Sequence, residues 1–112
     1  MDRLERFRHE IKKQGWDAAW VTKAANRQYL SGFTGSAGWV LVPARGQAVL
    51  VTDGRYTEQA RQEARKYKII ISVKDPMAVL SEWLKNQKIS KLAFEDDDVS
   101  VAAWKKIKSL TR

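Results

Sequence analysis

Helix and strand patterns alternate along the whole chain, and this alternation restricts the fold more than any other feature of the sequence. Leu4, Phe7 and Ile11 recur at helical spacing, and Gly15 follows as a stop signal. Residues 17–22 form a short, mostly apolar run that is typical of a buried strand. One or two helical turns are predicted over residues 24–30.

The middle of the chain predicts a hairpin and then a helix. Residues 39–42 and 48–52 are two β-prone runs, and the short connection over residues 43–47 contains a glycine. This spacing favours an antiparallel hairpin. An apolar face at helical spacing then predicts a helix over residues 55–66.

The last third of the sequence continues the alternation. Residues 69–73 are strongly β-prone, and Asp75 and Pro76 are an N-cap residue and a proline suited to the first helical position. Residues 91–95 predict another strand, and an amphipathic helix follows from Val101. The complete order predicts an α/β fold, with a mixed sheet of about five strands and helices packed on it.

Length and composition favour one soluble domain. The chain has 112 residues, of which 44% are hydrophobic and 30% charged, and it has no cysteine. Disulfides and thiolate metal sites are therefore excluded. No apolar run reaches the roughly 18 residues that a membrane span needs, and no signal peptide is visible at the start. We expect a cytoplasmic protein without a membrane contact.

The net charge of +8 raises the question of an anionic partner. The basic residues are scattered over predicted helix exteriors, and the densest cluster is Lys105, Lys106 and Lys108. A solvated basic surface is favoured over nucleic-acid binding. A basic module that binds nucleic acid or another protein is the alternative. Most of the five tryptophans are expected in the core, and exposed ones would suit an interface.

The segment Gly32–Gly38 (GFTGSAG) is the most unusual part of the chain. It lacks both phosphate-loop spacings, and it follows a predicted helix and opens a strand, which is the wrong context for a nucleotide site. Ser36 lacks the glycine two positions earlier that a nucleophile elbow needs. His9, the single histidine, falls on the polar side of the first helix. Nucleophilic catalysis is not predicted.

Two polar segments connect strands to helices. The run Asp96–Asp98 could collect a divalent cation, but its position before a helix favours capping of free N–H groups. In the other connection, Asp53 is expected to cap a helix, Gly54 to form the turn and Tyr56 to pack on the sheet. Arg55 could pair with a carboxylate at a subunit contact.

The segments Asn26–Gly38 (NRQYLSGFTGSAG) and Val51–Ala60 (VTDGRYTEQA) carry a resemblance to a known family. Together they resemble the amino-terminal domain of the creatinase, aminopeptidase P and prolidase family, over essentially the whole chain. The pairing of GFTGSAG with TDGRY is more similar to Xaa-Pro aminopeptidases and short bacterial Xaa-Pro dipeptidases than to creatinases.

The resemblance implies a ribonuclease H-like α/β fold for residues 1–112. It also implies a carboxyl-terminal "pita-bread" catalytic domain that is absent from this chain. There two divalent metal ions (manganese, cobalt or zinc) would activate water against the bond before proline in Xaa-Pro peptides. None of the metal ligands carries over to this sequence, so we expect this chain to bind no cofactor and to be inactive alone.

The resemblance further implies a role in forming homo-oligomers and in overhanging a neighbouring subunit's active site. The residues that match the overhanging segment, and so could face substrate or another subunit, are Asn26, Arg27, Gln28, Tyr29, Phe33 and Ser36. Arg55 is added as a further intersubunit candidate. A creatinase-like amidinohydrolase is the alternative within the family, and the sequence leaves aminopeptidase and dipeptidase parents open.

Overall fold

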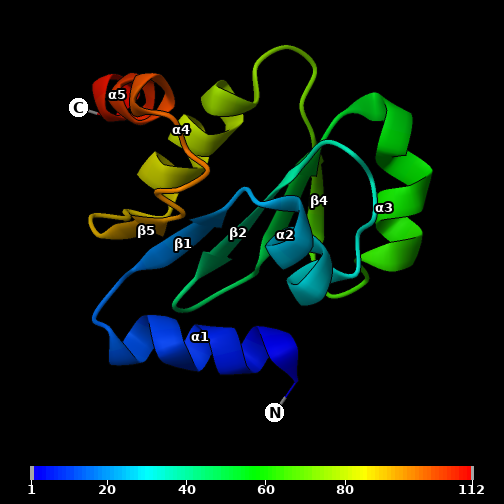
Figure 1. Cartoon of the computed structure of the whole chain (residues 1–112), viewed down its shortest axis with the longest axis horizontal. Helices are drawn as coiled ribbons and strands as arrows, with labels where there is room; N and C mark the ends of the chain where they lie inside the picture. Colours follow the sequence, from blue (N-terminus) through cyan, green and yellow to red (C-terminus); the bar gives the residue numbers. More distant parts are fainter. Residues whose placement is uncertain (1, 112) are drawn as a thin grey trace.

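The computed structural model describes residues 2–111 and confirms the predicted order of helices and strands (Figure 1). The chain forms a mixed five-stranded sheet with helices on both faces. Its elements are α1 (Arg3–Lys13), β1 (Ala18–Val21), α2 (Ala24–Ser31), β2 (Trp39–Pro43), β3 (Val49–Thr52), the 3-10 turn η1 (Gly54–Tyr56), α3 (Thr57–Glu63), β4 (Lys68–Ile71), α4 (Pro76–Asn86), β5 (Leu92–Phe94) and α5 (Val101–Leu110).

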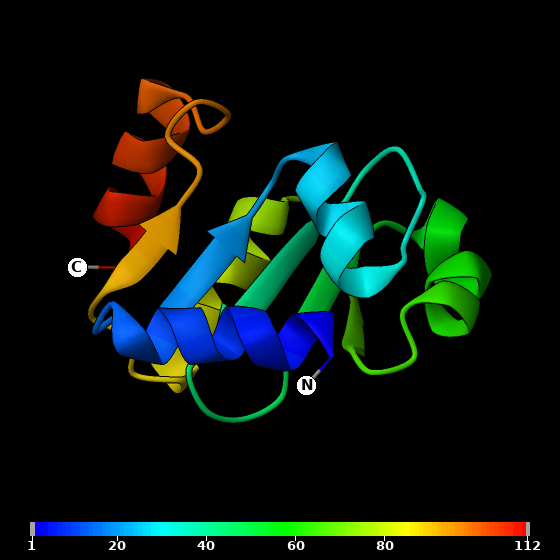
Figure 2. The ribbon, with the colours of Figure 1, turned by 60° about the horizontal axis from the view of Figure 1, so that its bottom comes forward.

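The sheet has the strand order β4-β3-β2-β1-β5. The hairpin of β2 and β3 is antiparallel as predicted, and β2 also pairs antiparallel with β1. The outer pairs, β3 with β4 and β1 with β5, are parallel. Four strands therefore point the same way and end at one edge of the sheet, which we call the carboxyl edge. Figure 2 shows the arrows of β1 and β5 pointing together toward this edge.

Both faces of the sheet are buried, which explains why the central strands read as continuous apolar runs. Along β2, Val40 and Val42 face one core, which α1 and α3 cover, whereas Leu41 faces the other core, against α4 and α5. All three side chains are fully buried. The alternation along each strand divides the apolar residues between two helix layers, as in other α/β domains.

Two predicted boundaries were wrong. The helix expected over residues 55–66 is the 3-10 turn η1 followed by α3, because Asp53 caps the turn at the backbone N–H of Arg55. The strand expected over residues 69–73 is β4, which ends at Ile71. Its neighbour β3 ends at Thr52, the residue paired with Ile71, so the ladder stops there. Val73 lies beyond the sheet and is 90% exposed.

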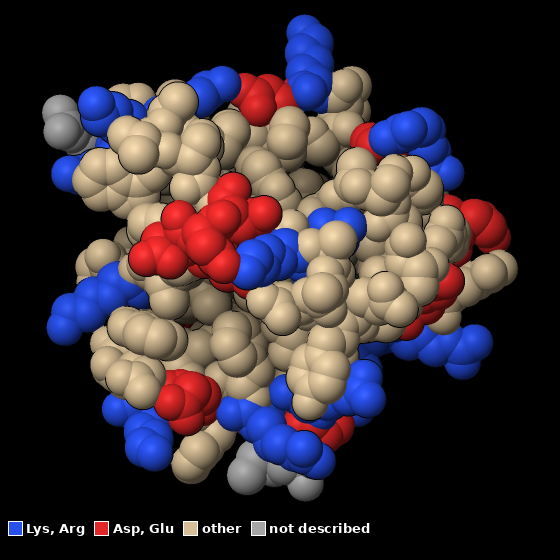
Figure 3. All heavy atoms as spheres, in the orientation of Figure 1, with Lys and Arg blue, Asp and Glu red and all other residues tan. Residues whose placement is uncertain are grey.

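The surface carries its basic residues on many elements, and Figure 3 shows them dispersed around the visible face. His9 is exposed, in agreement with its predicted place on the polar side of α1. Within residues 2–111, none of the helices has the length and apolar character that crossing a membrane would require.

Asp17 ties the start of β1 to the start of β5. Its Oδ2 atom accepts hydrogen bonds from the Ser90 N–H at 3.0 Å, the Ser90 hydroxyl at 2.9 Å and the Lys91 N–H at 2.9 Å. These bonds, led by the one from Lys91, lower the pKa of the Asp17 carboxyl below its ordinary value of 3.8. The ionised carboxylate therefore fastens the short edge strand β5 to the sheet.

We predict that Asp17→Asn reduces the loss of folding stability at acidic pH. A carboxyl whose pKa is lowered by folding contributes stability above its ordinary pKa, and that stability is lost as the pH falls through the folded value. Urea unfolding of the wild type should therefore show a loss of stability from about pH 5 downward, and the variant a smaller loss. Asp96→Asn, which removes an exposed carboxylate after β5, is the charge-matched control. An equal loss of stability at acidic pH in the wild type and in Asp17→Asn would contradict this role.

Candidate functional site

The carboxyl edge collects most of the residues that the sequence marks as candidates. The connections that follow β1, β3 and β5 all begin there, and ligands of α/β sheets bind most often outside the carboxyl ends of parallel strands. The glycine-rich segment Gly32–Gly38 joins α2 to β2 and enters the sheet at the same edge. We therefore consider this edge as the candidate site.

Arg27 is the structural centre of the edge. Only 5% of this residue is exposed, and its guanidinium donates to three backbone carbonyls: Nη1 to Thr22 O at 3.2 Å and to Gly38 O at 3.0 Å, and Nη2 to Gly35 O at 2.9 Å. Burial lowers the pKa of Arg27, and the charge of Asp98 partly opposes this shift. The buried cation thus binds the end of β1 to the middle and the carboxyl end of the glycine-rich loop.

The loop's glycines are required by close packing. Gly32 ends α2 in the left-handed conformation, at a φ of 82°. A Cβ atom built on Gly35 would lie 2.2 Å from the Phe33 ring, and one on Gly38 would lie 3.0 Å from the Val51 carbonyl oxygen. These three glycines therefore serve the backbone of the loop, and at Gly35 and Gly38 the cause is lack of space.

A second group of side chains lies beside the loop. Ser36 and Tyr56 share a hydrogen bond between their hydroxyl groups. The Arg55 guanidinium lies 5.0 Å from the centre of the Tyr56 ring and pairs with Asp53, its Nη2 at 2.9 Å from Oδ2. The bond from Ser36 is the main cause of a lowered Tyr56 pKa. Ser36 and Arg55 are both exposed, and each of them contacts Tyr56.

A third group follows β5. Glu95 accepts from the backbone N–H groups of Thr22 at 2.7 Å and Lys23 at 2.9 Å, and also from the Asn26 amide. Asp97 pairs with the Lys23 ammonium, which lowers the pKa of Asp97.

The capping role predicted for Asp96–Asp98 was wrong. The N-cap of α5 is Ser100, whose side chain accepts from the Ala103 N–H. Asp98 accepts from the Thr22 hydroxyl. Two of the three aspartates therefore bond to the connection after β1, one full turn before the helix begins.

The seven candidate residues divide by exposure. Arg27 and Phe33 are buried in the domain, with Phe33 fully so, and their side chains stabilise the loop. Asn26, Gln28, Tyr29, Ser36 and Arg55 are exposed and free to meet another surface. Arg55 has its carboxylate partner, Asp53, within this chain. Tyr29 lies apart from the edge groups, under the Arg3 guanidinium of α1.

Sequence reasoning missed two participants in this site. Tyr56 was expected to pack on the sheet, and it does contact the Phe33 ring edge-on, but its hydroxyl also joins Ser36. Glu95 was assigned only to a strand. Its signal was available in part, because a carboxylate directly after a strand is placed to accept from neighbouring backbone N–H groups.

The residues present do not fit a pair of divalent metal ions. Among residues 2–111, no group of three or more His, Asp or Glu side chains is placed to hold a metal ion. Glu95, Asp97 and Asp98 are instead engaged by amide, ammonium and hydroxyl donors. No metal-dependent step is therefore assigned to this domain.

Comparison with known proteins places this fold in a family. Residues 3–112 match the family described as Creatinase/Prolidase N-terminal domain, and the chain belongs to this family. The amino-terminal domain of the cytoplasmic peptidase PepQ from Mycobacterium tuberculosis is 33% identical. It superimposes with a TM-score of 0.88 over 96% of this chain and 83% of that one. The resemblance seen in the sequence is confirmed.

Longer relatives extend well beyond the matched region. The Xaa-Pro dipeptidase from Bacillus anthracis is 32% identical with a TM-score of 0.88, over 96% of this chain but 30% of that enzyme. A Bacillus subtilis protein named uncharacterized peptidase YqhT is 29% identical over 91% of this chain and 29% of its own length. The chain thus spans less than one third of these two relatives.

We predict that Gly35→Ala destabilises the domain and that Gly54→Ala does not. The added methyl group at Gly35 meets the buried Phe33 ring, and an overpacked core costs about 1–3 kcal/mol. At Gly54 nothing lies within 4 Å of the added atom, so the change in unfolding free energy should stay within about 0.5 kcal/mol. Denaturant unfolding of both variants tests this, and equal effects would contradict the packing account.

Proposed function

We propose that this chain is the non-catalytic amino-terminal domain of a metal-dependent Xaa-Pro peptidase. The observation that carries the proposal is its similarity, along 96% of its length, to both the PepQ domain and the Bacillus anthracis dipeptidase. The peptidase names of these relatives favour a peptidase parent over an amidinohydrolase. The description of PepQ as cytoplasmic supports the same location for the parent.

In this proposal the chemistry belongs to a carboxyl-terminal catalytic domain. Two divalent ions, manganese, cobalt or zinc, would activate water and polarise the carbonyl before proline in that domain. The present domain binds none of these ions. Its part in the reaction is to contact another surface through its carboxyl edge.

The domain's proposed role is to join subunits and to cover a neighbouring active site. Three exposed residues on or beside the carboxyl edge, Asn26, Ser36 and Arg55, can reach another surface. Arg27 and Phe33 act indirectly, since they hold the loop that carries Ser36. A rigid loop suits this role, because a cover that limits substrate length must keep its shape when a peptide meets it.

The isolated chain should not release proline or any amino acid from Xaa-Pro peptides when manganese, cobalt or zinc is added. The reason is that the described residues provide no group of metal ligands. Chromatographic product analysis, with an active Xaa-Pro dipeptidase as positive control, is the measurement. Turnover that follows this chain through purification would contradict the proposal.

The covering role predicts a change in substrate length preference in the full-length parent. Arg55→Gln should alter the ratio of kcat/KM values for short and long Xaa-Pro peptides by about threefold or more, the size expected from one polar contact. Arg45→Gln, at the β2–β3 turn on the opposite edge, is the matched control. If both variants leave the ratio unchanged, the carboxyl edge does not face the substrate.

A further inference from the structure

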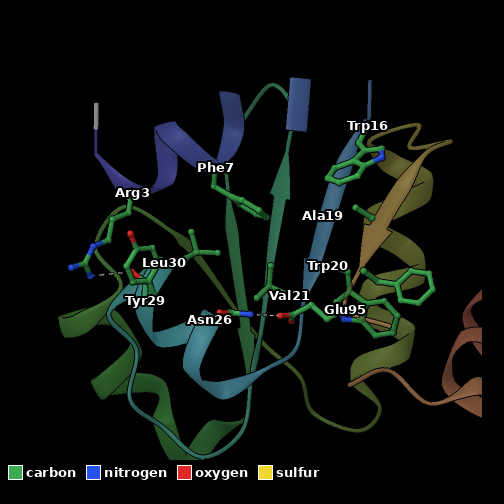
Figure 4. Close-up of a pocket in the computed structure, with 12 residues that line it drawn as sticks. Arg3, Phe7, Trp16, Ala19, Trp20, Val21, Asn26, Tyr29, Leu30 and Glu95 are labelled. Atoms are coloured by element: carbon green, nitrogen blue, oxygen red, sulfur yellow. Dashed lines mark hydrogen bonds between the residues drawn. The ribbon is translucent and has the colours of Figure 1, made fainter. Parts of the chain in front are cut away.

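A half-open groove crosses the sheet face on the α1 and α2 side, over β1 and β5 (Figure 4). Its floor is small and apolar, formed by Ala19 and Val21 of β1 and Ala93 of β5. Phe7 and Trp16 form one wall, and α2 forms the other. The groove encloses about 440 Å³, which lies within the range of sites that bind small molecules or short peptides.

Aromatic side chains stand exposed at the rim of this groove. Trp16 is 38% exposed and Tyr29 is 54% exposed, although both rings border an apolar hollow. Exposed apolar surface of this kind, when it is concentrated at a concave site, marks a contact with another molecule. The groove therefore has the shape and the walls of a binding site.

A fixed carboxylate lies at one end of the groove, where Figure 4 shows Glu95 beside Asn26. Glu95 Oε1 accepts from two backbone N–H groups, and Oε2 accepts from the Asn26 amide. Each carboxylate oxygen accepts about two hydrogen bonds, so Oε2 retains capacity for one more. The three donors are neutral amides, so they orient the carboxylate without cancelling its charge.

The charge around Glu95 is negative in a chain that is strongly basic as a whole. Asp96, Asp97 and Asp98 follow directly, and Lys23 pairs with Asp97. Figure 3 shows a cluster of acidic side chains, bordered by uncharged surface and, on one side, by basic side chains. These four carboxylates outnumber the two cations beside them, Lys23 and Arg27, so the local field still attracts a cation.

The opposite end of the groove carries a positive charge. The Arg3 guanidinium lies 4.4 Å from the centre of the Tyr29 ring and donates to the Tyr29 carbonyl oxygen at 3.2 Å. This positive charge disfavours a second cation in the groove. The complementary ligand therefore has one positive charge at its Glu95 end and apolar groups along the rest of its length.

We propose that this groove binds a peptide segment in which a single lysine or arginine is flanked by apolar residues. The basic head group would donate to Glu95 Oε2, while the neighbouring apolar side chains would cover the floor and contact the Trp16 and Tyr29 rings. Both basic side chains suit the site, because their aliphatic stems lie on apolar surface while their charge stays near water. This inference rests on the groove alone and is independent of the peptidase proposal.

The test is a titration of the isotope-labelled chain with acetyl-Leu-Lys-Leu-amide, followed by NMR. We expect saturable shifts at the amides of the floor residues and at the Trp16 indole. Replacing the lysine of the peptide by norleucine should weaken binding about tenfold, since a charge-assisted hydrogen bond is lost, and glutamate should weaken it further. These peptide changes leave the protein intact, so they test the proposal even if a protein variant folds poorly.

Two protein variants complete the test. Glu95→Gln keeps an oxygen acceptor for the backbone N–H groups but removes the charge, so it should abolish the difference between the lysine and norleucine peptides. Asp96→Asn removes a neighbouring exposed carboxylate and should change the affinity less than about threefold. Trp16→Ala should weaken both peptides alike.

Four outcomes would overturn the proposal. The first is the absence of saturable shifts at the groove, and the second is equal affinity for the lysine and glutamate peptides. The third is that the same shifts arise without peptide when the protein concentration is raised, which would make the occupant a second copy of the chain. The fourth is that butylammonium alone binds as tightly as the peptide, which would make the ligand a small cation.

Discussion

The buried guanidinium of Arg27 is the interaction on which the carboxyl edge depends. It joins the Thr22, Gly35 and Gly38 carbonyls, which belong to the end of β1 and to the loop before β2. Removing it would leave three carbonyls without their donor, at a cost of about 1–3 kcal/mol for each one that stays buried. The loop then carries Ser36 to Tyr56 and Arg55, so one buried cation determines where several exposed groups lie.

Two of the three groups of residues at this edge serve different purposes. The group around Arg27 and Phe33 turns inward and fixes backbone, whereas the group around Ser36 and Arg55 faces outward. Together they define a rigid edge whose exposed polar groups can contact another surface. This division of roles occurs in a domain of the Creatinase/Prolidase N-terminal family.

Short-range patterns were sufficient to predict the order of elements, the antiparallel hairpin and the caps at Asp53 and Asp75. Each of these features depends on residues that are close in sequence. The limits of β4 depend on where β3 ends, which local preference does not contain. The burial of Arg27 was unforeseen because its three acceptors come together only in the folded chain. The groove over β1 and β5 was likewise invisible, since its walls come from distant segments.

The most direct measurement is amide hydrogen exchange in Arg27→Met, with Arg45→Met as the control for loss of a positive charge. If Arg27 fixes the loop, exchange should accelerate across residues 33–38 in Arg27→Met, while β2 and β3 stay protected and Arg45→Met resembles the wild type. Unchanged protection of residues 33–38 in a folded Arg27→Met protein would contradict the account, because the loop would then keep its shape without the cation.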